Sequence, residues 1–195
     1  MTTRKTELDS LKECYRYNSY VRKKYLQALE KLPKEELVRD RGASYPSILE
    51  IFIHVLGAYR YWLMIVYPKL SKAEIERLED ESSSKYPKLF KEEGRLKEAL
   101  DEAKNLEKEV DAFVMNYVEG LDDEKLASSF ETTMSGKKKR FTVSQMLWHL
   151  VEEELQHRGE LNALFWQMDI DPPHTDWLDW KVETGEVKQE PIAAE

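Results

Sequence analysis

The stretch that decides the fold is FTVSQMLWHLVEEELQHRGELNALFWQM, which runs from Phe141 to Met168. Its apolar residues recur at the three- and four-residue spacing of an amphipathic helix. On a helical wheel, several of them fall within about 80° of Glu153, so this carboxylate lies inside the apolar stripe. They are Met146, Leu150, Leu161, Leu164 and Met168. A carboxylate that faces a protein core is costly unless it is paired, hydrogen-bonded or bound to a metal.

Glu153 is followed four residues later by His157. On a helix their Cα atoms lie roughly 6 Å apart, so one carboxylate oxygen and one imidazole nitrogen can reach a common metal ion. The alternative is a row of surface ion pairs formed by Glu152, Glu153, Glu154, His157 and Arg158. A third ligand from elsewhere in the chain would favour the metal site.

Length and composition limit the possible classes of protein. A chain of 195 residues is long enough for one domain with a sizeable core, and we expect a single domain over 1–195. The 35% of charged residues and only seven glycines favour an all-α fold. A net charge of −8 argues against binding to nucleic acid. We find neither a long membrane-spanning apolar run nor a secretion signal, and expect a cytoplasmic protein without a membrane partner.

The apolar periodicity predicts four main helices, over 6–32, 47–67, 93–118 and 143–168. In the third of them, Phe113 and Tyr117 are among the residues predicted to face inward. Capping boxes that begin at Ser47 and Thr142 predict the starts of the second and fourth helices. The span 68–92 is predicted as one long crossover with a possible short helix from Ser71. The Ser- and Thr-rich segment before Thr142 has Ser-Gly at its centre, and it predicts a short hairpin or an irregular loop.

The C-terminal region contains two prolines followed by tryptophans. We expect residues 170–182 to form a cap that packs on the helices, with a frayed tail after it. His174, beside the prolines, is expected to be exposed.

Other polar residues stand at inward positions of the predicted helices. His54 lies in the middle of the apolar stripe of the second helix, where it is either a core residue or a ligand. Asn18 and Arg22 interrupt the stripe of the first helix and face either a polar pocket or solvent. If the second helix packs against the fourth, His54 lies opposite Glu153 and His157. Two imidazoles and one carboxylate would form an open metal site with positions left for water or substrate.

Several short segments carry a family resemblance, in order along the chain. They are Tyr17–Tyr20, Glu35–Leu37, SILEIFIH over Ser47–His54, Trp62-Leu63, HRGEL over His157–Leu161, Pro172-Pro173 and Asp176. With these segments the chain resembles the DinB-like superfamily, also called YfiT-like, of metal-dependent helical proteins. The resemblance implies an up-down-down-up four-helix bundle.

The resemblance also implies a set of metal ligands. In that superfamily three histidines usually bind a divalent ion, and the matching positions here are His54, Glu153 and His157. Glu153 stands where histidine is commoner in the superfamily. The carboxylate either shifts the metal preference of the site toward zinc, manganese or iron over nickel, or indicates that the site has decayed. His149 is a less favoured substitute ligand, because it lies roughly 12 Å from His157 along the helix.

Further residues are candidates for contact with the ligands, a substrate or a cofactor. Glu50 and Tyr61 share the face of His54, and Asn18 is a third candidate. The alternative role for Glu50 is to cap its own helix. Glu160 either orients His157 or faces solvent. No dedicated general base stands out, so catalytic residues remain unassigned.

The resemblance implies a function in thiol chemistry. It points to a thiol-dependent S-transferase, or a related hydrolase or isomerase, in which a divalent metal activates water or the thiolate of a low-molecular-weight thiol. The substrate would be a small molecule, and homodimers are common in the superfamily. The alternative is a non-catalytic small-ligand-binding or stress-response bundle with a structural or vestigial metal site. The acidic charge disfavours DNA binding.

Overall fold

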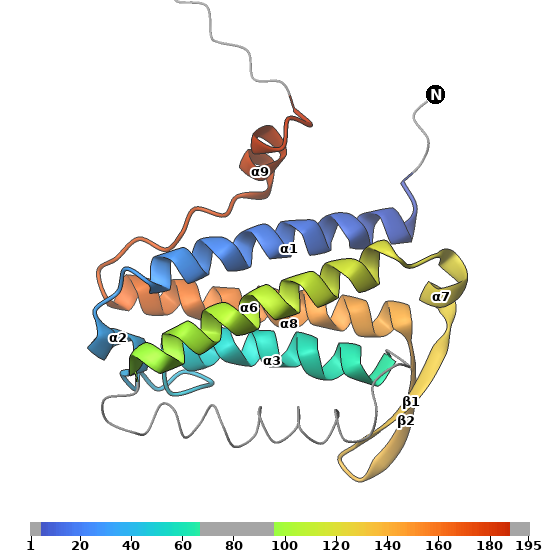
Figure 1. Cartoon of the computed structure of the whole chain (residues 1–195), viewed down its shortest axis with the longest axis horizontal. Helices are drawn as coiled ribbons and strands as arrows, with labels where there is room; N and C mark the ends of the chain where they lie inside the picture. The colour runs from blue at the N-terminus through green and yellow to red at the C-terminus, as the bar shows by residue number, and fades with distance from the viewer. Residues whose placement is uncertain (1–4, 67–95, 188–195) are drawn as a thin grey trace, which may run out of the picture.

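The computed structural model of the chain describes residues 5–66 and 96–187. Most of these residues belong to four long helices that lie side by side (Figure 1): α1 (Glu7–Leu29), α3 (Ile48–Val66), α6 (Leu96–Glu119) and α8 (Val143–Gln167). Helices α1 and α3 each contact both α6 and α8, so the apolar core lies between all four. The mostly helical fold confirms the prediction from composition and periodicity. The short helix predicted from Ser71 lies outside the described residues.

The capping residues begin the helices where the sequence predicts. The Thr142 hydroxyl accepts from the Gln145 amide at 3.1 Å, and the Gln145 side chain accepts from the Thr142 amide at 2.9 Å. This reciprocal pair is the capping box predicted for α8. At the start of α3, the Ser47 hydroxyl accepts from the Glu50 amide at 3.3 Å and donates to the Glu50 carboxylate at 2.8 Å. The cap fixes the entry of α3 and therefore the position of the residues along it.

Two details of the predicted helices are wrong. Helix α1 ends at Leu29 instead of residue 32, because the amides of Lys31 and Leu32 bond to carbonyls three residues back and the chain tightens into a turn. In α6, the predicted inward aromatics Phe113 and Tyr117 are only partly buried. Val114 and Val118 are fully buried instead. The helix is thus rotated so that small β-branched residues face the core and the aromatic rings lie at its edge.

The segment before α8 is a hairpin, the first of the two predicted alternatives. After the short helix α7 (Asp123–Ala127), strand β1 (Ser129–Met134) pairs antiparallel with β2 (Lys137–Thr142). The two turn residues, Ser135 at φ 52° and Gly136 at φ 71°, both have the positive φ that two-residue hairpin turns favour. The hairpin contacts α3 and α8, at the end of α3 and the start of α8 (Figure 1).

Two short helices complete the secondary structure of the described residues: α2 (Lys34–Val38), in the connection from α1 to α3, and α9 (Trp177–Glu183). Helix α9 packs on α1, where the Tyr17 ring lies 4.7 Å from Trp177 and 5.4 Å from Trp180 between centroids. It forms the helical part of the predicted cap over 170–182. His174 is exposed, as predicted, and pairs with Asp179.

Helix α3 is the most apolar helix of the described part of the chain. An 18-residue window of this 19-residue helix has a mean hydropathy of 1.4, enough by length and composition to cross a membrane, although the sequence prediction found no such run. However, 61% of that window is buried inside the structure. This burial is typical of the core helix of a soluble protein.

Candidate metal centre

The structure brings together the three predicted ligands, one from α3 and two from α8. Nε2 of His54 lies 2.9 Å from Oε1 of Glu153, and Nε2 of His157 lies 3.2 Å from the same oxygen. The spacing of four residues places Glu153 and His157 on one face of α8, as the helical repeat requires. Helix α3 packs against that face and supplies His54. Their role as metal ligands stays a prediction.

A second carboxylate holds the far side of the His157 ring. Nδ1 of His157 lies 3.2 Å from Oε2 of Glu160, and the Ser44 hydroxyl donates to this same oxygen. Because an ionised carboxylate only accepts hydrogen bonds, this contact is a hydrogen bond in the tautomer that carries its proton on Nδ1. In a neutral imidazole, Nε2 then has a lone pair directed toward Glu153. Carboxylate–histidine pairs of this kind fix the tautomer and orientation of metal-binding histidines.

The connection between α2 and α3 closes one side of the cluster. The Tyr45 ring stacks on His54 with 4.2 Å between centroids and an interplanar angle of 26°. It also lies 6.0 Å from the His157 ring. His157 is buried, whereas the side chains of His54 and Glu153 remain 28% and 20% exposed. The cluster is therefore enclosed on the His157 side and open to small molecules on the side of His54 and Glu153.

The surroundings shift the pKa values of His54 and Glu153 toward the protonation states of metal ligands. Burial lowers the pKa of His54, although the hydrogen bond with Glu153 opposes this effect. Burial would raise the pKa of Glu153, but its contacts with the His54 and His157 imidazoles outweigh this effect, and the pKa lies below its ordinary value. A neutral imidazole and an ionised carboxylate are the forms that bind divalent metals.

The donor atoms satisfy the distance requirement of a single ion. One nitrogen from each of His54 and His157 and one oxygen of Glu153 lie within 4.8 Å of one another. Ligands that hold one ion at about 2.0–2.2 Å in a tetrahedral arrangement lie roughly 3.5 Å apart. The two contacts to Glu153, at 2.9 and 3.2 Å, are somewhat shorter than this spacing. The residues present therefore fit a divalent cation with small side-chain adjustments.

The other predicted candidates lie around this cluster with different partners. Glu50 has the capping contact with Ser47 described above. Tyr61 is 39% exposed, and its ring lies against Trp62. His149 is exposed, and its ring nitrogen, a Glu152 oxygen and a Glu153 oxygen form a second, more open group of possible ligands.

A buried polar cluster between α1 and α8 was missed as such by the sequence interpretation. Glu154, grouped there with surface acids, is only 3% exposed and accepts from Arg22 Nη1 at 2.8 Å and from the Tyr59 hydroxyl at 2.6 Å. Arg22 also donates to Asp111 at 3.2 Å. Asn18 donates to the Tyr59 hydroxyl at 3.1 Å and so belongs to this cluster. The inward positions of Asn18 and Arg22 were the available signal, and the polar-pocket alternative for them is confirmed.

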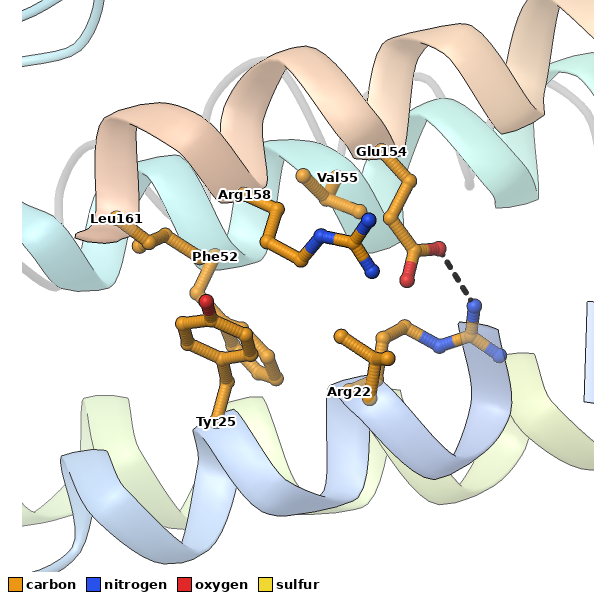
Figure 2. A pocket seen from close by; sticks show the side chains of 8 residues that line it. Arg22, Tyr25, Phe52, Val55, Glu154, Arg158 and Leu161 are labelled. Atoms are coloured by element: carbon orange, nitrogen blue, oxygen red, sulfur yellow. Dashed lines mark hydrogen bonds and ion pairs between the residues drawn. The ribbon is translucent and has the colours of Figure 1, made fainter. Parts of the chain in front are cut away.

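A small cavity lies beside this cluster (Figure 2). Arg22 from α1 and the side chains of Glu154 and Arg158 from α8 point toward one another across it. Among the described residues, Arg22 Nε and Glu154 Oε1 are buried without a hydrogen-bond partner. The cavity volume of about 10 Å³ is on the scale of one water molecule. It is too small for a substrate.

A comparison with protein-family models identifies the family of the chain. The sequence model of the DinB family matches residues 1–190, which is nearly the whole chain. Comparison with curated protein sequences finds no match.

Proposed function

Because the chain belongs to the DinB family, we propose that it is a divalent-metal-dependent enzyme whose ligands are His54, Glu153 and His157. We also propose the up-down-down-up order of the four long helices and a small-molecule substrate. The most specific activity that we propose is thiol-dependent S-transfer, or a related hydrolysis or isomerisation.

One observation carries the proposal. Oε1 of Glu153 faces Nε2 of His157 at 3.2 Å, while Nδ1 of His157 is engaged by the Glu160 carboxylate. A neutral imidazole carries one proton for these two carboxylates, so one of the two contacts joins two acceptor atoms, which attract each other only if a cation or a second proton lies between them. A divalent cation supplies that charge and can bind His54 at the same time.

The chain's own residues suit an open catalytic site. Glu160 and Ser44 hold His157 in one orientation, and Tyr45 covers one face of the His54 ring. A bound divalent cation polarises an oxygen or sulfur group and lowers the pKa of bound water or thiol. The partly exposed side chains of His54 and Glu153 leave access for such a group. This access favours catalysis over the alternative, in which the ion only braces the helices.

Cobalt substitution tests the proposal. Protein purified without an affinity tag is loaded with Co²⁺, and its absorption spectrum is recorded before and after addition of 2-mercaptoethanol. We expect one bound Co²⁺ and a new sulfur-to-cobalt band in the wild type and in Glu152→Gln, whose exposed carboxylate is the matched control. Glu153→Gln should lose both signals.

Two results would contradict the proposal. Unchanged cobalt binding in Glu153→Gln would show that the ion binds elsewhere. A bound cobalt ion whose spectrum does not respond to the thiol would exclude thiolate activation and favour a bracing role.

A further inference from the structure

A larger cavity lies between the end of α3, the hairpin and the start of α8. Its volume is about 340 Å³, within the range of small-molecule sites. Its lining is mostly apolar and aromatic, with two polar side chains: it consists of Trp62, Met134, Phe141, Gln145, Met146 and His149. Figure 1 shows the hairpin beside the ends of both helices, where these residues lie. Apolar walls with a few polar groups are typical of sites that bind organic molecules.

His149 connects this cavity with the candidate metal centre. It lines the cavity, and its ring packs edge-on against Trp62 with 5.4 Å between centroids. A nitrogen of the same ring lies within 4.8 Å of a Glu153 oxygen. Trp62 lies two helical turns beyond His54 on α3, which corresponds to roughly 12 Å. The polar centre and the apolar cavity are therefore neighbours along the same pair of helices.

From this continuity we propose that the cavity binds the apolar part of the substrate whose reacting group is held at His54, Glu153 and His157. The inference rests on the proposed function and adds a substrate class. The substrate is an amphiphilic small molecule that carries an aryl or alkyl group roughly 6–12 Å from the reacting atom. His149 and Gln145 stand among the apolar walls and can hydrogen-bond to a polar group of the linker.

The volume of the cavity and the net charge of the chain favour a small molecule over a peptide or nucleic acid. The cavity volume accommodates one ring or a short alkyl chain, and its two polar side chains offer few partners for a peptide backbone. The chain carries a net charge of −8, which opposes a polyanion. An apolar substituent gains affinity here because Trp62 and Met146 are already buried and need not be ordered on binding.

Two hydroxamates test the inference on the zinc-loaded protein by isothermal titration calorimetry. Acetohydroxamate carries only the metal-binding group, and a phenylbutyl hydroxamate adds an aryl group on a flexible linker. We expect the phenylbutyl compound to bind about tenfold or more tightly than acetohydroxamate. The affinity of the phenylbutyl compound relative to acetohydroxamate should fall below about threefold in Met134→Gln, where a polar side chain enters the cavity wall. Met115→Gln makes the same change at a partly buried methionine of α6, and this variant should keep the full gain in affinity of the phenylbutyl compound.

The outcomes separate this inference from the proposed function. If acetohydroxamate binds but the phenyl group adds no affinity, the inference is wrong and the metal-dependent function stands. If the gain survives in Met134→Gln and circular dichroism shows both variants folded, the aryl group binds elsewhere and the inference is again wrong. If the protein binds neither zinc nor acetohydroxamate, the proposed function fails and the inference fails with it.

Discussion

The buried ion pair between Arg22 and Glu154 gives a stability prediction that the structure makes quantitative. Arg22 and Glu154 are 2% and 3% exposed. Removal of one partner from a buried pair costs about 3–5 kcal/mol, because the other charge stays buried. Arg22 keeps Asp111 as a second partner at 3.2 Å, which places Glu154→Ala at the low end, about 3 kcal/mol. For a domain of this size, the expected fall in Tm is about 6–12 °C.

Urea unfolding followed by circular dichroism measures this loss. The matched control is Glu152→Ala, two residues earlier on α8, whose side chain is 66% exposed and 3.8 Å from His149. Its unfolding free energy should change by less than about 0.5 kcal/mol. The double variant Arg22→Met with Glu154→Leu should recover most of the loss, because neither charge of the pair is left buried without its partner. If Glu154→Ala and Glu152→Ala cost the same within about 1 kcal/mol, the reasoning about the buried pair is wrong.

Three further predictions concern caps, the hairpin turn and pH. Thr142→Ala removes the α8 capping box and should lower the unfolding free energy by about 1 kcal/mol in urea titrations; no loss would contradict its capping role. Gly136→Ala should cost about 1 kcal/mol in the same assay, because its φ of 71° disfavours a side chain although no atom lies within 4 Å of the added Cβ. Burial raises the pKa of Asp111, but hydrogen bonds from Lys23 and Ser19 and the charge of Arg22 outweigh it, so the folded pKa lies below its ordinary value. The stability that Asp111 contributes is therefore present above about pH 4 and is lost as the pH falls through the folded pKa. In urea titrations, the difference in unfolding free energy between wild type and Asp111→Asn should become smaller at acidic pH. A difference that grows on acidification would contradict this sign.

The helices could be predicted from the sequence because apolar periodicity and capping boxes are local signals. The Thr142 box and the long apolar repeat after it specify α8 without any knowledge of its neighbours. The buried face of α6 could not be predicted in this way. Phe113 and Val114 are both apolar, and only the packing of the other helices decides which of them is buried. Hydrophobicity alone does not separate such adjacent stripes.

The candidate site shows the same limit. Three consecutive acids on α8 have three different environments: Glu152 is exposed, Glu153 contacts His54 of α3, and Glu154 contacts Arg22 of α1. The spacing to His157 indicated the middle residue, but no local pattern indicated Glu154. Ser44 and Tyr45 lie in a connection without periodicity, so their contacts with the cluster follow from tertiary structure alone.

The most direct test of the central claim is metal analysis of protein purified without an affinity tag. Wild type, His157→Ala and His149→Ala are incubated with zinc, passed through a desalting column and measured by inductively coupled plasma mass spectrometry. The account predicts close to one zinc per chain in the wild type and in His149→Ala, and a large loss in His157→Ala. Zinc that is absent from the wild type, or that persists in His157→Ala, would contradict a metal site formed by His54, Glu153 and His157.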